Sequence, residues 1–156
     1  MKILNQQIFE NKEAAALPGL MESGGLPALV SGLSGIHRVN LAAALYENLE
    51  LPMFVVCPDD SAAESFTRDL ESMLGRPVNT LYSRDFTFYP SLAASREAEQ
   101  KRLYVLNALR CGESPVTVAT VSALMQRAIP PQTLGKATFT VKDGEPCPPE
   151  ELEAAL

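Results

Sequence analysis

The fold class is decided by two adjoining runs near the N-terminus, Leu26-Pro27-Ala28-Leu29-Val30 and Ser31-Gly32-Leu33-Ser34-Gly35. The first run is apolar and is bounded by turn residues, which is typical of a strand buried on both faces. Apolar residues then recur at helical spacing from Val39 to Leu49. This order predicts a strand, a glycine loop and a helix.

A second unit of the same kind follows directly. Met53-Phe54-Val55-Val56-Cys57 is another apolar run, which ends at Pro58. A helix is expected after it, because Ser61 and Glu64 have the spacing of a capping box, in which each side chain accepts a hydrogen bond from the other residue's backbone N–H. Gly75 is the expected end of this helix, since glycine adopts the left-handed conformation that closes many helices.

Two shorter strands complete the alternation. Residues 78–82 are expected to form a strand that leads through an aromatic loop into a long helix over 95–109. Residues 116–119 are β-branched and short, and they precede a brief helix over 121–127. Strands that alternate with helices through short connections predict an α/β fold, with a mainly parallel sheet flanked by helices.

The residues near the two ends of the chain do not continue this alternation of strands and helices. A helix is predicted over 6–17, ended by Pro18-Gly19, with Ile8 and Phe9 facing inward. Residues 137–141 alternate like a half-exposed strand, and a helix is expected to start at Pro148-Pro149. We therefore predict two domains, an α/β domain over 1–134 and the start of a second domain over 135–156. Because that last helix stops after two turns, the chain is expected to be a piece of a longer protein.

Composition narrows the classes of function. The chain has 156 residues and a net charge of −6, with 13 basic residues against 19 acidic ones. Binding of duplex DNA depends largely on Lys and Arg, so this segment is not expected to bind DNA directly. No apolar run approaches the roughly 20 residues that span a bilayer, and a cytoplasmic location is expected. The three cysteines, Cys57, Cys111 and Cys147, are too far apart for a CxxC motif and are expected to be structural.

The glycine loop invites comparison with the phosphate-binding P-loop, G-x-x-x-x-G-K-[ST]. When Gly32 is placed on the first glycine, Gly35 falls inside the loop, and His37, Arg38 and Val39 fall on the second glycine, the lysine and the hydroxyl residue. His37 adds a side chain where glycine is required, the planar guanidinium of Arg38 does not replace a compact ammonium, and Val39 offers no oxygen to magnesium. These replacements predict a degenerate nucleotide loop that binds no cofactor and no metal. A glycine turn that never bound phosphate explains Gly32 and Gly35 equally well.

The acidic residue that a P-loop ATPase needs is also missing. Asp59 and Asp60 come too early in the chain and are interpreted as helix-start residues, and Thr120 follows the later strand 116–119. We therefore predict no catalytic residue in this segment. We expect side chains to fill the vacated phosphate pocket, with Arg38 paired to Asp59 or Asp60.

Two enzymatic alternatives stay open at this stage. The first is a working nucleotide-binding domain, such as a small kinase or ATPase, with an atypical loop. The second is a dinucleotide-binding enzyme, although residues 32–35 lack the G-x-G-x-x-G spacing that such enzymes use.

Three segments, in their order and spacing, resemble the N-terminal region of the bacterial transcription-repair coupling factors. They are residues 28–35 with 41–45, residues 82–89, and residues 116–127 (VTVATVSALMQR), which match best. The resemblance covers nearly the whole chain from about Gly25.

This resemblance implies a fold, partners and a role. The N-terminal region of that family is similar to the damage-recognition protein UvrB, and its first domain is a RecA-like P-loop domain that has lost ATP binding. The family's second domain docks UvrA, and later domains bind RNA polymerase and translocate on duplex DNA with ATP and magnesium. The chain is thus expected to be a non-catalytic scaffold that packs against other domains of such a motor. The connection from Tyr82 to Ser95 is too short for the DNA-clamping hairpin of UvrB, so Phe86, Phe88 and Tyr89 are expected to serve packing rather than base stacking.

Overall fold

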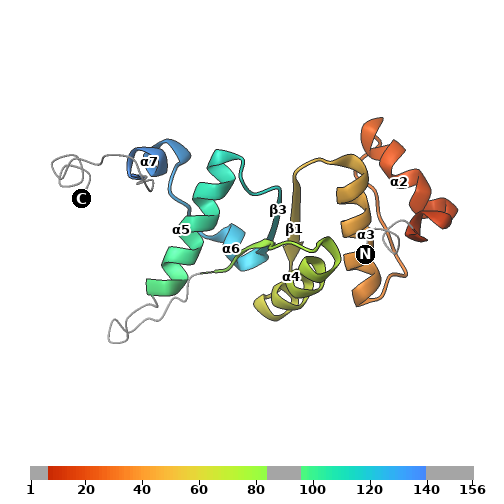
Figure 1. Ribbon diagram of the computed structural model, residues 1–156, viewed down its shortest axis with the longest axis horizontal. Helices are drawn as coiled ribbons and strands as arrows, with labels where there is room; N and C mark the ends of the chain where they lie inside the picture. Colours follow the sequence, from red (N-terminus) through yellow and green to blue (C-terminus); the bar gives the residue numbers. More distant parts are fainter. Residues whose placement is uncertain (1–6, 84–95, 140–156) are drawn as a thin grey trace.

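Three parallel strands form the centre of the computed structural model, which describes residues 7–83 and 96–139 (Figure 1). The strands are β1 (Met53–Cys57), β2 (Asn79–Leu81) and β3 (Val116–Thr120), and their order in the sheet is β1-β3-β2. Met53 lies opposite Val116 and Asn79 lies opposite Thr117. β3 is therefore the central strand, with β1 and β2 on either side of it.

Helices cover both faces of this small sheet. The connection from β1 through α4 to β2 and the connection from β2 through α5 back to β3 run in opposite directions across the sheet. Right-handed crossovers therefore place α4 and α5 on opposite faces. Figure 1 shows α3 and α5 on opposite sides of the strands, and α3 contacts α4. The helical elements are η1 (Ile8–Glu10), α2 (Lys12–Glu22), α3 (Gly35–Leu49), α4 (Asp60–Leu74), α5 (Arg96–Cys111), α6 (Val121–Met125) and α7 (Pro131–Lys136).

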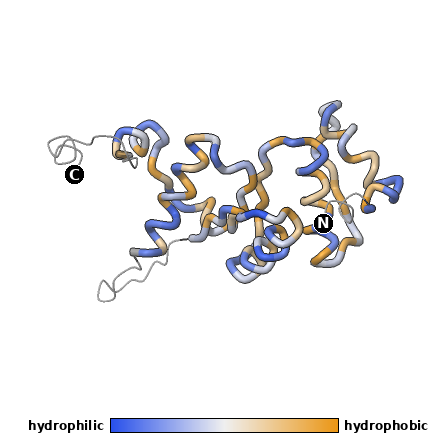
Figure 2. Tube along the Cα trace, in the orientation of Figure 1, coloured by the Kyte–Doolittle hydropathy of each residue, from blue (hydrophilic) through white to orange (hydrophobic). Residues whose placement is uncertain are grey.

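Two hydrophobic clusters hold these layers together. The larger one joins α3 and α4 to one face of the sheet through residues such as Val39, Leu70 and Val118. The smaller one joins α5 and α6 to the other face around Val105 and Ala119. All five residues of β3 are buried because both layers cover this strand. In Figure 2, β1 is hydrophobic along its length, whereas α4 carries both hydrophobic and hydrophilic residues, as expected for a helix at the surface.

The prediction of an α/β fold with a parallel sheet flanked by helices is confirmed. The strands predicted over 53–57, 78–82 and 116–119 are all present with small shifts of their ends, and so are the helices that follow them. One detail of β1 differs from the expectation of an inner strand. Phe54 and Val56 are 46% and 51% exposed, because α5 and α6 cover β2 and β3 on that face but leave β1 open.

The prediction of a strand over Leu26–Val30 is wrong. These residues are in neither a strand nor a helix, and the side chain of Leu29 is 94% exposed. A strand needs a neighbouring strand to take its backbone hydrogen bonds, and within residues 7–83 and 96–139 nothing pairs with this segment. Apolar composition alone therefore did not make it a strand.

The predicted N-terminal helix is displaced along the chain. α2 begins at Lys12 because the side chain of Asn11 accepts hydrogen bonds from the backbone N–H groups of Glu13 (2.9 Å) and Ala14 (3.4 Å). The helix then continues through Pro18, where it was expected to end, as far as Glu22. Proline removes one backbone donor, and the helix tolerates this loss here.

The start of α4 also differs from the prediction. Its N-cap is Asp59, whose carboxylate accepts a hydrogen bond from the N–H of Ala62 at 2.8 Å, so the expected capping box of Ser61 and Glu64 is wrong. The backbone of Asp59 is extended where the chain leaves β1. Its carboxylate therefore reaches the free N–H groups at the start of α4 before the side chain of Ser61 does. The predicted end at Gly75 is confirmed, with φ at +68°.

The region after α6 is more regular than expected. The predicted boundary between residues 134 and 135 falls inside α7, which contacts α5. Ala137–Phe139 are not in a strand, and the rest of the predicted strand, with the helix expected at Pro148, lies outside the described residues. The division into domains at 134 and 135 stays a prediction.

Candidate functional site: the glycine loop at the start of α3

The glycine loop joins residues 26–31, which are in neither a helix nor a strand, to α3. Gly32 has a φ of +81°, a left-handed conformation that favours glycine, so the backbone itself calls for this residue. Gly35 is the first residue of α3. A Cβ on either glycine would meet no other atom within 4 Å, so the space beside both of them is open.

The helix begins earlier here than in the P-loop pattern. In that pattern the loop extends to the second glycine, and the first N–H groups of the helix that starts there point at the phosphates. α3 instead begins at Gly35, and the backbone N–H of Arg38 already donates to the carbonyl of Ser34 at 3.1 Å. His37, Arg38 and Val39 therefore lie within the helix, which shortens the loop available to surround a phosphate.

Side chains of the loop and the first helical turn bind one another. Ser34 is the N-cap of α3, but its hydroxyl makes no capping bond to the backbone. It lies 2.7 Å from Nδ1 of His37 instead. Nε of Arg38 donates to the carbonyl of Leu33 at 3.3 Å. His37 and Arg38 are both exposed. Nδ1 of His37 and Nε of Arg38 are hydrogen-bonded to residues of the loop.

The residue at the hydroxyl position faces the protein interior. Val39 is 2% exposed and belongs to the cluster that joins α3 and α4 to the sheet. A side chain placed this way contributes to stability through burial of apolar surface. It carries no oxygen and is turned away from solvent, so this position is unsuited to hold magnesium.

The expectation that side chains fill the vacated pocket is wrong. A cavity of about 470 Å³ lies beside Arg38, with walls from α3, from the end of β1 and from α4. The expected pairing of Arg38 with Asp59 or Asp60 is also absent among the described residues, because Arg38 binds Leu33 and the Asp59 carboxylate caps α4. Asp69 of α4 lines the same cavity. Arg38 and Asp69 thus give the cavity one cationic and one anionic side chain.

The two positions examined for a catalytic acid are both helix caps. Asp59 caps α4, in agreement with its interpretation as a helix-start residue. Thr120, the last residue of β3, caps α6 by accepting a hydrogen bond from the N–H of Ala123 at 3.1 Å. Each side chain therefore has a structural role at the carboxyl end of its strand.

Cys57 ends β1 next to this cavity. Its side chain is buried, and burial together with the negative charge of Asp59 raises the pKa of the thiol. The thiol stays protonated at neutral pH, which makes it a weak nucleophile. Cys111 is exposed, and Cys147 lies outside the described residues. The placement of Cys57 agrees with the prediction of a structural residue.

One buried charge, Arg102 on α5, was not predicted from the sequence. Its side chain is 5% exposed and donates to the carbonyls of Tyr82 (2.7 Å) and Ala123 (3.2 Å). It therefore links the end of β2 to α6. The signal was present in the spacing, because Arg102 precedes Val105 and Leu106 by three and four residues on the apolar face of its helix.

Residues 7–83 and 96–139 contain no group of three or more His, Cys, Asp or Glu side chains arranged to hold a metal ion. Over the same residues, no helix is long and apolar enough to cross a bilayer.

The fold and the site together define an α/β domain with a small parallel sheet and a glycine loop in which the P-loop side chains are replaced. A comparison with known proteins adds the family resemblance. The chain is 30% identical over 156 residues to the transcription-repair-coupling factor of Bacillus subtilis (strain 168), a match that covers 96% of this chain and 13% of that protein. The resemblance to the transcription-repair coupling factors is thereby confirmed. No family model matches the chain, and no solved structure matches it.

Proposed function

We propose that this chain is a non-catalytic scaffold segment of a transcription-repair coupling factor, built on a RecA-like, UvrB-like domain whose nucleotide loop no longer binds ATP. In this proposal the ATP- and magnesium-dependent translocation on duplex DNA belongs to other parts of a longer protein. The chain spans about 13% of the length of the relative it matches, which supports a role as one segment among several.

The placement of Val39 carries this proposal. A P-loop needs a hydroxyl at this position to bind magnesium, and here a buried valine packs into the core. Arg38 adds support, because its guanidinium binds the loop carbonyl of Leu33. A nucleotide would have to displace that contact and would find no metal ligand beside it.

One observation favours the rival, a working nucleotide-binding domain with an atypical loop. The cavity of about 470 Å³ lies at the carboxyl end of β1 and has Arg38 in its wall. Ligands of open α/β sheets bind outside the carboxyl ends of the strands, so the position is appropriate for a ligand.

Titration with a fluorescent ATP analogue in the presence of magnesium separates the two functions. The scaffold proposal expects no saturable binding, and millimolar ATP with magnesium should leave the melting temperature unchanged. Any ligand of the native state raises the melting temperature by mass action. At a hundredfold excess over Kd, the ligand raises the free energy of unfolding by about 2.7 kcal/mol.

A control variant makes a positive result interpretable. If the analogue binds and Arg38→Ala abolishes the binding while Arg110→Ala does not, the cavity is a nucleotide site and the scaffold proposal fails. Arg110 lies on α5, on the other side of the sheet, and its guanidinium binds Asn107.

The partners follow from the same proposal. We propose that the segment itself binds neither duplex DNA nor UvrA, and that UvrA docks on the following domain. Its net charge of −6 supports the absence of DNA binding. A gel shift at low salt should show no complex at micromolar protein. In a pull-down, UvrA should be retained by a chain extended through a full second domain and lost with this chain alone.

A further inference from the structure

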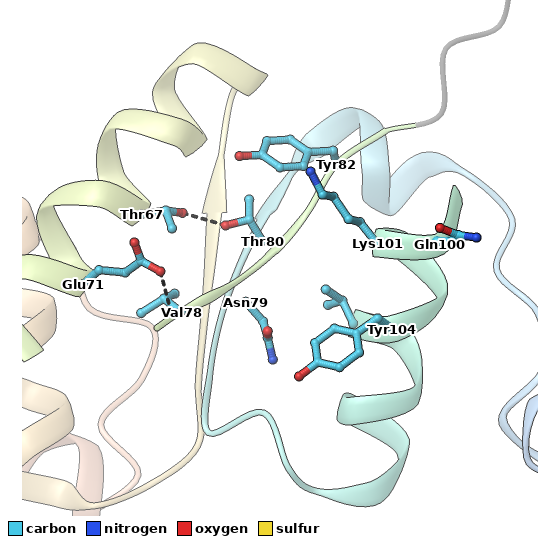
Figure 3. Close-up of a pocket in the computed structure, with 10 residues that line it drawn as sticks. Thr67, Glu71, Val78, Asn79, Thr80, Tyr82, Gln100, Lys101 and Tyr104 are labelled. Atoms are coloured by element: carbon cyan, nitrogen blue, oxygen red, sulfur yellow. Dashed lines mark hydrogen bonds between the residues drawn. The ribbon is translucent and has the colours of Figure 1, made fainter. Parts of the chain in front are cut away.

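Within residues 7–83 and 96–139, the outer edge of β2 has no neighbouring strand, and a groove between two helices runs along it. β2 pairs with β3 on one side, and on its other side lies a cavity of about 540 Å³ (Figure 3). α4 forms one wall of this groove with Thr67 and Glu71, and α5 forms the other with Lys101 and Tyr104. The groove therefore lies over a strand edge and is bounded by α4 on one face of the sheet and by α5 on the other.

A strand edge in such a groove is able to bind another strand. An outer strand presents unpaired N–H and C=O groups, and a partner chain satisfies them by adding a strand to the sheet. Just before β2, the backbone N–H of Val78 already donates to the carboxylate of Glu71 at 2.9 Å. This group is therefore not available to a partner strand. Thr67 and Thr80 bind each other through their hydroxyls at 2.8 Å, which fixes β2 against α4. Among the residues that the structure describes, no strand lies beside this edge of β2.

The groove has an excess of negative charge. Glu71 lies near its start, and an adjoining cavity of about 360 Å³ that shares Thr80, Tyr82 and Lys101 adds Asp60 and Glu64 at the other end. The two cations beside these acids have partners already. Lys101 pairs with Glu97 at 2.7 Å, and Arg102 donates to backbone carbonyls.

Two aromatic rings give the groove an apolar wall. Tyr104 is 67% exposed on α5, and Tyr82 follows β2 directly, near Lys101 (Figure 3). Val105 lies behind them in the core. Aromatic rings of this kind pack against apolar side chains and against the stems of Lys and Arg, while their hydroxyls stay hydrated.

We propose that the outer edge of β2 binds an extended, basic segment of a partner polypeptide, which adds to the sheet as a fourth strand. Charge complementarity selects the occupant, because the acids at both ends of the groove repel an acidic segment and attract a basic one. The alternation of a strand places every second side chain toward one wall, so cationic residues separated by apolar ones fit the groove best. This site is separate from the glycine loop and does not depend on whether that loop binds nucleotide.

Three model peptides test the proposal. Each is titrated into the whole ¹⁵N-labelled chain at 0.15 M salt, and the amide resonances are followed by NMR. The first is an acetylated hexapeptide amide of alternating Lys and Val. The second replaces each Lys by Glu. The third replaces the central Val and the Lys beside it by Pro, so that one ladder hydrogen bond is lost whichever N–H group faces β2, and carries one further Lys at its C-terminus to keep the charge. The Lys–Val peptide should shift the amide resonances of Asn79, Thr80 and Leu81 in a saturable way. The Glu–Val peptide should bind at least tenfold more weakly, and the Pro peptide at least fivefold more weakly.

Matched variants separate the groove from general attraction by an acidic protein. Asp60→Asn combined with Glu64→Gln should weaken binding of the Lys–Val peptide at least threefold. Glu22→Gln, on the exposed surface of α2, should leave it unchanged. Circular dichroism melts check that each variant is folded.

The other outcomes overturn the proposal. Equal binding of the Pro peptide means that charge alone attracts the ligand. Shifts confined to other elements place the site elsewhere. Lack of any shift in β2 at millimolar Lys–Val peptide means that this edge takes no strand.

Discussion

Residues 26–49 and 53–74 pass through the same series of an apolar run, a short turn and a helix, but they fold differently. In the second unit the run is β1, hydrogen-bonded along its length to β3, and the helix is capped by Asp59. In the first unit the run stays outside the sheet with Leu29 94% exposed, and the hydroxyl of Ser34 makes no capping bond. The two helices pack against each other, so the difference lies in what precedes them.

The difference shows what a buried strand needs besides apolar residues. β1 has a neighbour whose backbone receives its hydrogen bonds, and α3 and α4 cover one of its faces. The first run has no neighbouring strand within the described residues, and Leu29 is left almost fully exposed. An apolar run therefore forms a buried strand only where a neighbouring strand also satisfies its backbone hydrogen bonds.

The largest expected effect contrasts one leucine from each unit. Leu70 is fully buried between α4 and the sheet, so Leu70→Ala should lower the free energy of unfolding by about 3 kcal/mol. Leu29→Ala should change it by less than about 0.5 kcal/mol, because the side chain contributes little burial. Urea unfolding followed by circular dichroism measures both. A comparable loss for Leu29→Ala would show that the first run is packed in solution.

The ends of the two helices provide the next contrast. α4 ends at Gly75 with φ at +68°, and α3 ends at Glu50 with φ at +51°. A side chain is strained in this conformation, so Gly75→Ala should cost about 1 kcal/mol. Glu50→Gly should be stabilising by up to about 1 kcal/mol, because it relieves that strain. Thermal melts of the two variants should therefore shift in opposite directions, and a lower melting temperature for Glu50→Gly would contradict the assignment.

The starts of the helices give a smaller contrast. Asp59→Ala removes the carboxylate that accepts the N–H of Ala62, and should cost about 1 kcal/mol. Ser34→Ala should cost less than about 0.5 kcal/mol, because its hydroxyl binds exposed His37 and caps no N–H group. Equal losses in chemical denaturation would mean that both helices are capped alike.

The smallest effect is a pH dependence at the end of β1. Burial and Asp59 raise the pKa of the Cys57 thiol above its ordinary value of 9.0. The folded state then holds this proton more tightly than the unfolded state, so the stabilisation is fully present below about pH 9 and is lost as the pH rises toward the folded-state pKa. Cys57→Ala should flatten the decline in stability above pH 9, whereas exposed Cys111→Ala should leave it unchanged. Unfolding curves measured from pH 7 to pH 10.5 compare the two variants.

Much of the fold was predictable because local signals agreed with one another. The spacing in α3, the glycine at the end of α4 and the β-branched run of β3 each pointed to the element that formed. The glycine loop was also located correctly, with Gly32 at a positive φ and Gly35 at the helix start. Errors occurred where one local signal competed with another, as when Asp59 reached the first N–H groups of α4 ahead of Ser61.

The sequence by itself determined the alternation of strands and helices from Met53 onward, the position of the glycine loop and the side chains that replace the P-loop residues. These features depend on residue type and spacing along the chain, which local conformation preserves. Only the tertiary structure decided that Arg102 donates to the carbonyls of Tyr82 and Ala123, and that β1 and β2 are the outer strands of the described sheet. These hydrogen bonds and the strand order depend on contacts between residues far apart in the chain. Local patterns do not encode those partners, which is why the open groove at β2 became visible only once the sheet was assembled.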